Sequence, residues 1–203
     1  MALAIRDVKE QDLDAVLALN NGAGDAILTL DRRGLDYFFE HADYFRVAEI
    51  DGQLAGFLIA LRENVDYDSC NYRWFARREP EFVYIDRIVI APYQRGIGLG
   101  RVFYCDVQSY AEVRVPSLTC EVFLEPRNDA ALLFHGSFGF NEIGQQRMPH
   151  NNRRVSLLCK PLPSYAYVRD RYLRHGGLPD VPWLQSRALP AAATTARHGG
   201  NGH

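Results

Sequence analysis

The chain has 203 residues, of which 47% are hydrophobic and 24% charged, and its formal net charge is −2. This length suits one domain with an appendage, and the composition is that of a soluble globular protein. The balanced charge gives no reason to expect nucleic acid or an anionic membrane as a partner. The longest apolar stretch, residues 54–61, is far shorter than the ~20 residues that a membrane span needs.

In the N-terminal half, hydrophobic periodicity predicts a strand, two helices and two further strands. They are expected at residues 3–8, at 11–19, after a helix cap at Asp31, and at 44–50 and 54–61. The pair Asp51-Gly52 indicates a hairpin, because a type I′ turn needs positive φ at both central residues. Residues 62–81 are polar and aromatic without a clear period, so a long loop is predicted there.

The C-terminal half alternates strands and helices. Strands are expected at residues 82–90, 118–123, 140–147 and 155–159, and helices from residue 98 and over 128–138. This order predicts an α/β (α+β) fold with a twisted, mostly antiparallel mixed sheet flanked by helices. We expect the domain at residues 1–160, an extension at 161–187 that folds back or packs on a partner, and a disordered tail at 188–203.

The four cysteines, Cys70, Cys105, Cys120 and Cys159, are dispersed and include no Cys-x-x-Cys pair. The N-terminus lacks the apolar core of a secretory signal. We therefore predict a cytoplasmic protein with free, mostly buried thiols and no metal site.

The segment Gln94-Arg95-Gly96-Ile97-Gly98-Leu99-Gly100-Arg101 is the most informative in the chain. It follows the expected strand and the turn dipeptide Ala91-Pro92, and an amphipathic helix begins inside it. Alternate glycines allow a tight bend and a close approach of a ligand to the backbone. The free N–H groups of a helix N-terminus bind phosphate oxygens. The segment therefore predicts a site for a phosphorylated cofactor.

Two nucleotide-binding motifs fit this segment less well. A P-loop would end in Gly-Lys-Ser/Thr, whereas here Arg101 follows Gly100. A dinucleotide-binding motif would have G-x-G-x-x-G directly after the strand and an acidic residue about 20 positions further on, which Glu121 superficially supplies. Because five residues separate Ile90 from Gly96, a nucleotide-binding protein is the weaker alternative.

The pattern Arg95-x-x-Gly98-x-Gly100 instead resembles the acyl-CoA pyrophosphate loop of the Gcn5-related N-acetyltransferases (GNATs). A second block resembles the family pattern N-x-x-A-x-x-F-Y-x-x-x-G-F, with His135 in place of the tyrosine. The residues in register are Asn128, Ala131, Phe134, Gly139 and Phe140. The resemblance covers roughly residues 3–160 and implies a GNAT fold whose strands splay apart at the acyl-CoA site. It further implies that acetyl-CoA donates an acetyl group to a primary amine of a small molecule or peptide, by direct attack in a ternary complex.

The resemblance also implies which residues hold the cofactor, largely through their backbone. The expected contacts are Ile88, Val89, Ile90, Arg95, Gly96, Ile97, Gly98, Leu99, Gly100, Arg101, Asn128 and His135. A helix cap, which needs no ligand, is the alternative role for Asn128.

Asp86 is the leading candidate for the base that deprotonates the amine. A carboxylate in an apolar strand is costly unless it is paired or functional. An aspartate at the same distance before the glycine loop resembles the catalytic base of some aminoglycoside acetyltransferases of this superfamily. A structural pair with Arg87 is the alternative. With a period of two, one strand face is expected to carry Tyr84, Asp86, Ile88 and Ile90.

Glu121 and His135 complete the candidate catalytic set. Glu121 is the second candidate base, with a structural or substrate-binding role as the alternative. His135 is expected on a helix face with Asn128 and Leu132, directed at the cleft. The family tyrosine commonly protonates the departing thiolate, which a histidine does only as imidazolium, with a reference pKa of ~6.5. Acid catalysis and a simple contact with the thiol sulfur are both left open.

The segment Tyr67-Asp-Ser-Cys-Asn-Tyr-Arg-Trp-Phe75 resembles a stretch in a group of bacterial predicted acetyltransferases of unassigned substrate. Long ordered loops beside a cleft tend to be functional. We predict that the acceptor contacts Asn21, Tyr67, Tyr72, Arg73, Trp74 and Tyr84. Arg73 is the expected partner for a carboxylate, and a hydrophobic lid or a homodimer contact is the alternative for the aromatic residues.

A non-catalytic acyl-CoA-binding sensor is the main rival from another class. His135 in the tyrosine position supports the sensor, and Asp86 and Glu121 near the cleft speak against it. The sequence names neither the acceptor nor the oligomeric state, and it does not separate acetyl from a longer acyl group, because acceptor pockets are built from variable loops.

Overall fold

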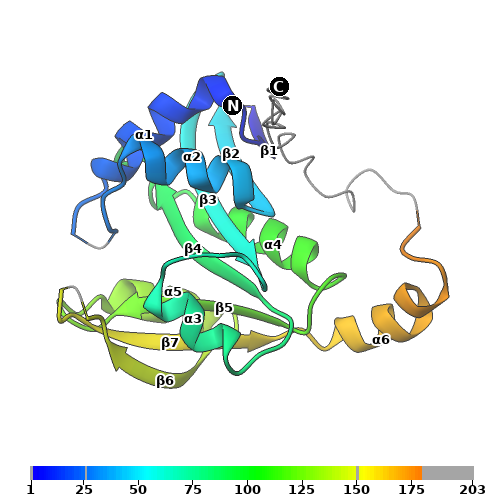
Figure 1. Ribbon diagram of the computed structural model, residues 1–203. Helices are drawn as coiled ribbons and strands as arrows, with labels where there is room; N and C mark the ends of the chain where they lie inside the picture. The colour runs from blue at the N-terminus through cyan, green and yellow to red at the C-terminus, as the bar shows by residue number, and fades with distance from the viewer. Residues whose placement is uncertain (1, 26, 150, 180–203) are drawn as a thin grey trace, which may run out of the picture.

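The computed structural model describes residues 2–25, 27–149 and 151–179, and seven strands form one mixed sheet (Figure 1). The strand order is β1-β2-β3-β4-β5-β7-β6, with antiparallel neighbours except for the parallel pair β4–β5. The strands are β1 (Leu3–Asp7), β2 (Tyr44–Ile50), β3 (Gln53–Arg62), β4 (Val83–Ile90), β5 (Ser117–Phe123), β6 (Asn141–Arg147) and β7 (Arg154–Pro161). The predicted fold class is confirmed.

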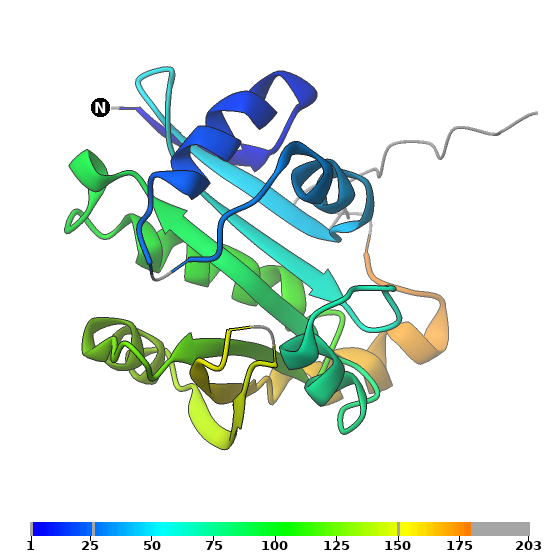
Figure 2. The ribbon, with the colours of Figure 1, turned by 60° about the vertical axis from the view of Figure 1, so that its left-hand side comes forward.

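Helices cover both faces of this sheet (Figures 1 and 2). The α-helices are α1 (Leu13–Asn21), α2 (Arg32–His41), α3 (Cys70–Ala76), α4 (Leu99–Ala111), α5 (Asp129–Ser137) and α6 (Ser164–Arg171), and the short 3-10 helices are η1 (Glu10–Asp12), η2 (Pro92–Gln94) and η3 (Leu173–His175). One core contains the apolar residues of α4, and the other those of α1, α2 and α3. Alternate residues of β3 enter the two cores, so this strand is buried on both faces.

Local sequence signals set several of these elements. The Asp31 side chain accepts a hydrogen bond from the Gly34 N–H at 2.7 Å and so caps α2 as predicted. Asp51 and Gly52 have φ values of 49° and 82°, which confirms the turn between β2 and β3. Tight local geometry of this kind can be read from sequence because neighbouring residues alone determine it.

The prediction of one long loop over residues 62–81 is wrong, because α3 lies within it. Ser69 caps this helix by accepting a hydrogen bond from the Tyr72 N–H at 3.3 Å. Tyr72 and Phe75 are buried against the sheet. A helix of two turns is not stable alone, so α3 depends on tertiary packing, which hydrophobic periodicity does not predict.

A β-bulge in β4 overturns the prediction that every second residue from Tyr84 shares one face. Ile59 pairs with Arg87 and Ala60 with Ile85, which leaves Asp86 as an extra residue. The alternation is therefore inverted past the bulge. The core beneath α4 receives Ile85, Ile88 and Ile90, whereas the other core receives Tyr84 and Val89.

The strands β4 and β5 diverge, as predicted for the cofactor site (Figure 2). They pair only where residues 83–85 of β4 lie beside residues 118–120 of β5. Beyond Ile85 and Cys120 the strands continue without a shared ladder. The backbone of β4 past the bulge is thus open on the side that faces β5.

The segment after β7 folds back on the domain. Tyr165 is buried, and its hydroxyl donates to Glu81 Oε2 at 3.1 Å. The Ser164 hydroxyl donates to Glu112 Oε2 at the same distance. The predicted tail at 188–203 lies outside the described residues. Over the described ranges, no helix combines the length and apolar character that crossing a membrane requires.

All four cysteines are free thiols. Cys120 is buried, Cys70 and Cys159 are half-buried and Cys105 is exposed, so the expectation of mostly buried thiols is wrong. The cytoplasmic location stays a prediction.

Candidate active site

A cavity of about 840 Å³ opens where β4 and β5 diverge. Its walls come from β4 residues 85–90, β5 residues 120–123 and the start of α4. The helix α5, the loop between α1 and α2, and residues 67–71 complete it. Segments far apart in the sequence therefore meet around one space.

The glycine segment forms one end of this cavity. Gly96 and Gly98 have φ values of 81° and 91°, and Gly98 is the N-cap of the 13-residue helix α4. Only glycine adopts this left-handed backbone without strain. A Cβ added at Gly100 would lie 3.3 Å from the Phe134 ring. The open helix N-terminus and the absence of side chains above it fit the diphosphate of an acyl-CoA.

Most of the predicted cofactor contacts line the cavity. Ile97 is the exception, because it is 54% exposed and does not belong to the cavity lining. The Arg95 Nε–H donates to the Ile90 carbonyl at 3.2 Å, which joins the loop to the end of β4. Asn128 lines the cavity and also caps α5, accepting from the Ala131 N–H at 3.0 Å. Both roles foreseen for Asn128 are thus compatible with its position.

His135 lies in the cavity wall with both ring nitrogens engaged. Its Nδ1 is 2.7 Å from the Ala131 carbonyl, which only accepts, so we assign the proton to Nδ1. The Nε2 atom then accepts from the Tyr104 hydroxyl at 2.7 Å. Burial lowers the pKa of His135. The geometry therefore favours a neutral imidazole that holds Tyr104.

Replacing His135 by phenylalanine is expected to lower the free energy of unfolding by about 1–3 kcal/mol, because the buried Tyr104 hydroxyl loses its acceptor. The double variant with Tyr104→Phe should recover most of this loss, since both polar partners are then removed. Urea unfolding of the four proteins in the cycle measures the coupling. The pH dependence of turnover between pH 6 and 9 should keep its shape; a change of shape would restore the acid role.

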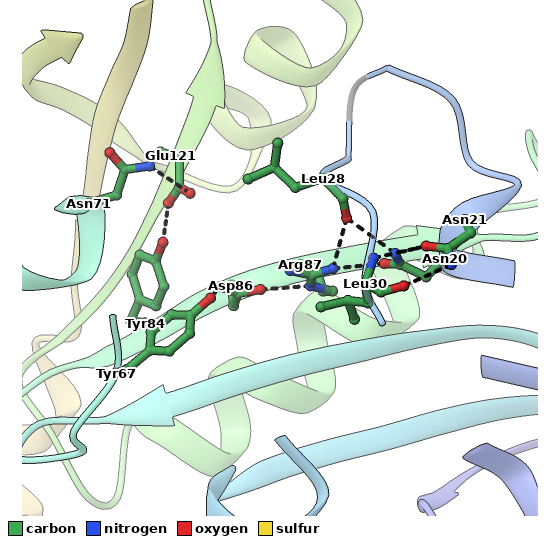
Figure 3. A network of polar contacts seen from close by, with 10 residues as sticks. All are labelled: Asn20, Asn21, Leu28, Leu30, Tyr67, Asn71, Tyr84, Asp86, Arg87 and Glu121. Atoms are coloured by element: carbon green, nitrogen blue, oxygen red, sulfur yellow. Dashed lines mark hydrogen bonds and ion pairs between the residues drawn. The ribbon is translucent and has the colours of Figure 1, made fainter. Parts of the chain in front are cut away.

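Glu121 of β5 faces the cavity between two hydrogen-bond donors (Figure 3). The Tyr84 hydroxyl donates to its Oε2 at 2.6 Å, and Asn71 Nδ2 donates to its Oε1 at 3.0 Å. Burial, together with the nearby charge of Asp86, raises the pKa of Glu121 to about 7, although both hydrogen bonds act in the opposite direction. Glu121 can therefore exchange a proton near neutral pH.

This pKa links Glu121 to stability. The folded protein holds the Glu121 proton more tightly than the unfolded chain, whose ordinary pKa is 4.5, so stability is lost as the pH rises from 4.5 through about 7. Glu121→Gln removes this loss. Relative to wild type, the free energy of unfolding of the variant should increase by up to about 3 kcal/mol as the pH rises from 5 to 8. Urea unfolding at both pH values measures the gain, and an equal difference at both would contradict it.

Asp86 is held from two sides (Figure 3). Its Oδ2 accepts from Arg87 Nε at 2.7 Å, and its Oδ1 accepts from the Tyr67 hydroxyl at 2.6 Å. The Asp86 and Arg87 side chains are 5% and 7% exposed. The ion pair weighed as the alternative for Asp86 is thus present, and each carboxylate oxygen already has a partner.

Of the six residues predicted to bind the acceptor, one lines the cavity and five do not. Tyr67 lines the cavity, whereas Asn21, Tyr72, Arg73, Trp74 and Tyr84 stand outside its lining. Asn21 bonds both backbone groups of Leu30, and Arg73 pairs with Asp68. Through these contacts Asn21 and Arg73 hold neighbouring segments of the chain in place.

Asn71, Arg87 and Tyr104 are among the cavity residues for which the sequence predicted no place in the lining. For Arg87, the available signal was a second charge beside Asp86 in an apolar strand. The sequence carries no comparable signal for Tyr104 or Asn71, because their partners lie on distant elements.

Two splayed strands, a glycine-capped helix end and a titratable carboxyl group around one cavity define the site of an acyl-CoA-dependent transferase. Residues 14–140 match the model of the acetyltransferase (GNAT) family, and the chain belongs to this family. It is an acetyl-CoA-dependent N-acetyltransferase, which confirms the resemblance seen in the sequence.

Solved structures agree on the fold. The ribosomal-protein-S18-alanine N-acetyltransferase of Escherichia coli is 19% identical with a TM-score of 0.62, over 79% of this chain and 94% of that chain. Ard1 of Thermoplasma volcanium is 16% identical with a TM-score of 0.64, over 80% and 99%. Chaetomium thermophilum Naa20, in complex with a bisubstrate analogue, is 20% identical with a TM-score of 0.63, over 87% and 93%. No curated protein sequence matches the chain.

Proposed function

We propose that the enzyme transfers the acetyl group directly to a primary amine of a small molecule or peptide within a ternary complex, with Glu121 as the base. The observation that carries this proposal is a carboxyl group with a pKa of about 7 that faces the cavity between the splayed strands. A general base works best when its pKa lies near the operating pH.

Acetyl-CoA supplies the acetyl group as a thioester. The amides of residues 95–100 and the open backbone of β4 past Asp86 would hold it. Glu121 takes a proton from the amine, whose nitrogen then forms the amide bond as the carbon–sulfur bond breaks. A thiol has a pKa of ~8.5, so the sulfur can depart as thiolate without a strong acid. We accordingly assign His135 to positioning Tyr104 in the cavity wall rather than to acid catalysis.

Asp86 has a supporting role in this proposal. Its two oxygens hold Arg87 and Tyr67, and its negative charge helps to raise the pKa of Glu121. The ranking of the two candidate bases is therefore reversed from that based on the strand pattern.

The test is a thermal-shift titration with acetyl-CoA, CoA, NAD and ATP, followed by an amine panel read by thiol release. A ligand that binds only the native state raises the melting temperature. Stabilisation by acetyl-CoA with thiol release on some amine supports the proposal. Stabilisation without turnover of any amine favours a binding module instead, and stabilisation by NAD or ATP alone contradicts the cofactor assignment.

A further inference from the structure

Arg87 is a buried cation that lines the cavity, and its polar contacts are drawn in Figure 3. It is 7% exposed and follows the bulged residue of β4. Its Nε donates to Asp86 at 2.7 Å, and its Nη1 donates to Asn20 Oδ1 at 2.8 Å and to the Leu28 carbonyl at 3.1 Å. These bonds anchor the guanidinium between β4, the last turn of α1 and the loop that follows α1.

The remaining nitrogen of this guanidinium is Nη2. A guanidinium has five N–H groups, and the bonds just described account for three of them. No acceptor for Nη2 occurs among residues 2–25, 27–149 and 151–179. Nη2 is not among the fully buried polar atoms that lack a partner in the described residues, so it is accessible, and because Arg87 lines the cavity this donor is available to a ligand there.

We propose that the acceptor amine carries a carboxylate, which binds Nη2 of Arg87 while the amino group faces Glu121. This inference rests on the proposed function and names its substrate class, an aminocarboxylate. Guanidinium and carboxylate form strong charge-assisted hydrogen bonds. The strand pairing sets Arg87 and Glu121 on neighbouring strands, and their charges interact.

The charges around Arg87 favour a singly charged anion. Asp86 already balances one positive charge, and Glu121 adds a negative one when it acts as base. A phosphate would bring nearly two charges into this surrounding, whereas an aminocarboxylate is neutral overall as a zwitterion. Arg73, the cation predicted for this task, is paired with Asp68 and lies outside the cavity lining.

Matched acceptors test the proposal. Each amino acid of a panel is compared with its carboxamide and with the amine that lacks the carboxyl group, and thiol release gives kcat/KM. The wild-type enzyme should prefer the carboxylate by about 10-fold or more, the effect of one charged hydrogen bond. Arg87→Lys keeps the positive charge but loses the planar array of guanidinium N–H donors. The preference of this variant for the carboxylate should fall to about 3-fold or less.

Arg73→Lys is the matched control, because it changes an arginine of the same neighbourhood that does not line the cavity; its preference should equal that of wild type. The melting temperature and the acetyl-CoA affinity of both variants establish that each is folded. Equal turnover of carboxylate and carboxamide by wild type, or an unchanged preference in Arg87→Lys, would overturn the proposal.

A binding measurement separates this inference from the proposed function. N-acetyl amino acids and their carboxamides are titrated into the CoA complex by calorimetry. If no amine is acetylated, the proposed function fails, yet carboxylate-dependent binding that is lost in Arg87→Lys would still uphold the site. Equal affinity for acid and carboxamide would reject the site whatever the turnover.

Discussion

Replacing Glu121 by glutamine is expected to lower kcat by about 10²–10⁴-fold, the usual contribution of a positioned general base. The amide keeps nearly the same shape and still accepts the hydrogen bond from the Tyr84 hydroxyl. It cannot take a proton from the amine. Steady-state kinetics with saturating acetyl-CoA, on any amine found in the panel, measures the loss.

The pH dependence of the wild-type enzyme identifies the same group. Because the base must be ionised, kcat/KM should fall as the pH drops below about 7, the pKa of Glu121. This limb should be absent from the residual activity of Glu121→Gln. Glu142→Gln, on β6 and outside the cavity lining, is the control and should keep the wild-type profile. Retention of more than half of the wild-type kcat by Glu121→Gln would show that another group is the base.

Gly98→Val should weaken acetyl-CoA binding by about 100-fold. A β-branched residue is strained at a φ of 91°, and relaxing that strain turns the N-terminal amides of α4 away from the diphosphate. Loss of two charged hydrogen bonds, each contributing about 1.5–3 kcal/mol, is enough for this effect. Calorimetric titration with acetyl-CoA provides the dissociation constant.

Gly52→Val is the matched control for this change. Gly52 has a φ of 82° in the turn between β2 and β3, and like Gly98 it has no atom within 4 Å of an added Cβ. Both variants therefore introduce similar strain, but Gly52→Val should leave acetyl-CoA binding unaltered. If both variants bind acetyl-CoA like wild type, the glycine segment does not hold the diphosphate.

Much of the fold and the cofactor end of the site could be predicted from sequence. The strands, the capped α2, the Asp51-Gly52 turn and the glycine segment before α4 depend on residues that are neighbours in the chain. The two short α-helical turns of α3 could not, because their stability comes from packing Tyr72 and Phe75 on the sheet.

At the acceptor end of the site, too, local features could be predicted from sequence and long-range contacts could not. Strict alternation wrongly placed Ile88 and Ile90 on the same face as Tyr84, because a bulge is a property of strand pairing and not of β4 alone. His135 was identified as a departure from the family pattern, but its partner Tyr104 lies 31 positions earlier in the sequence.

The sequence by itself determined the order of the strands and predicted the phosphate-binding segment, since both depend on local periodicity, turns and glycine conformation. The tertiary structure alone decided which carboxyl group is poised to exchange a proton. Burial and the charge of Asp86 raise the pKa of Glu121 against the opposing effect of donors from β4 and α3, elements that only the folded chain brings beside β5. The same assembly engages three of the five N–H groups of Arg87 and leaves Nη2 without an acceptor among the described residues.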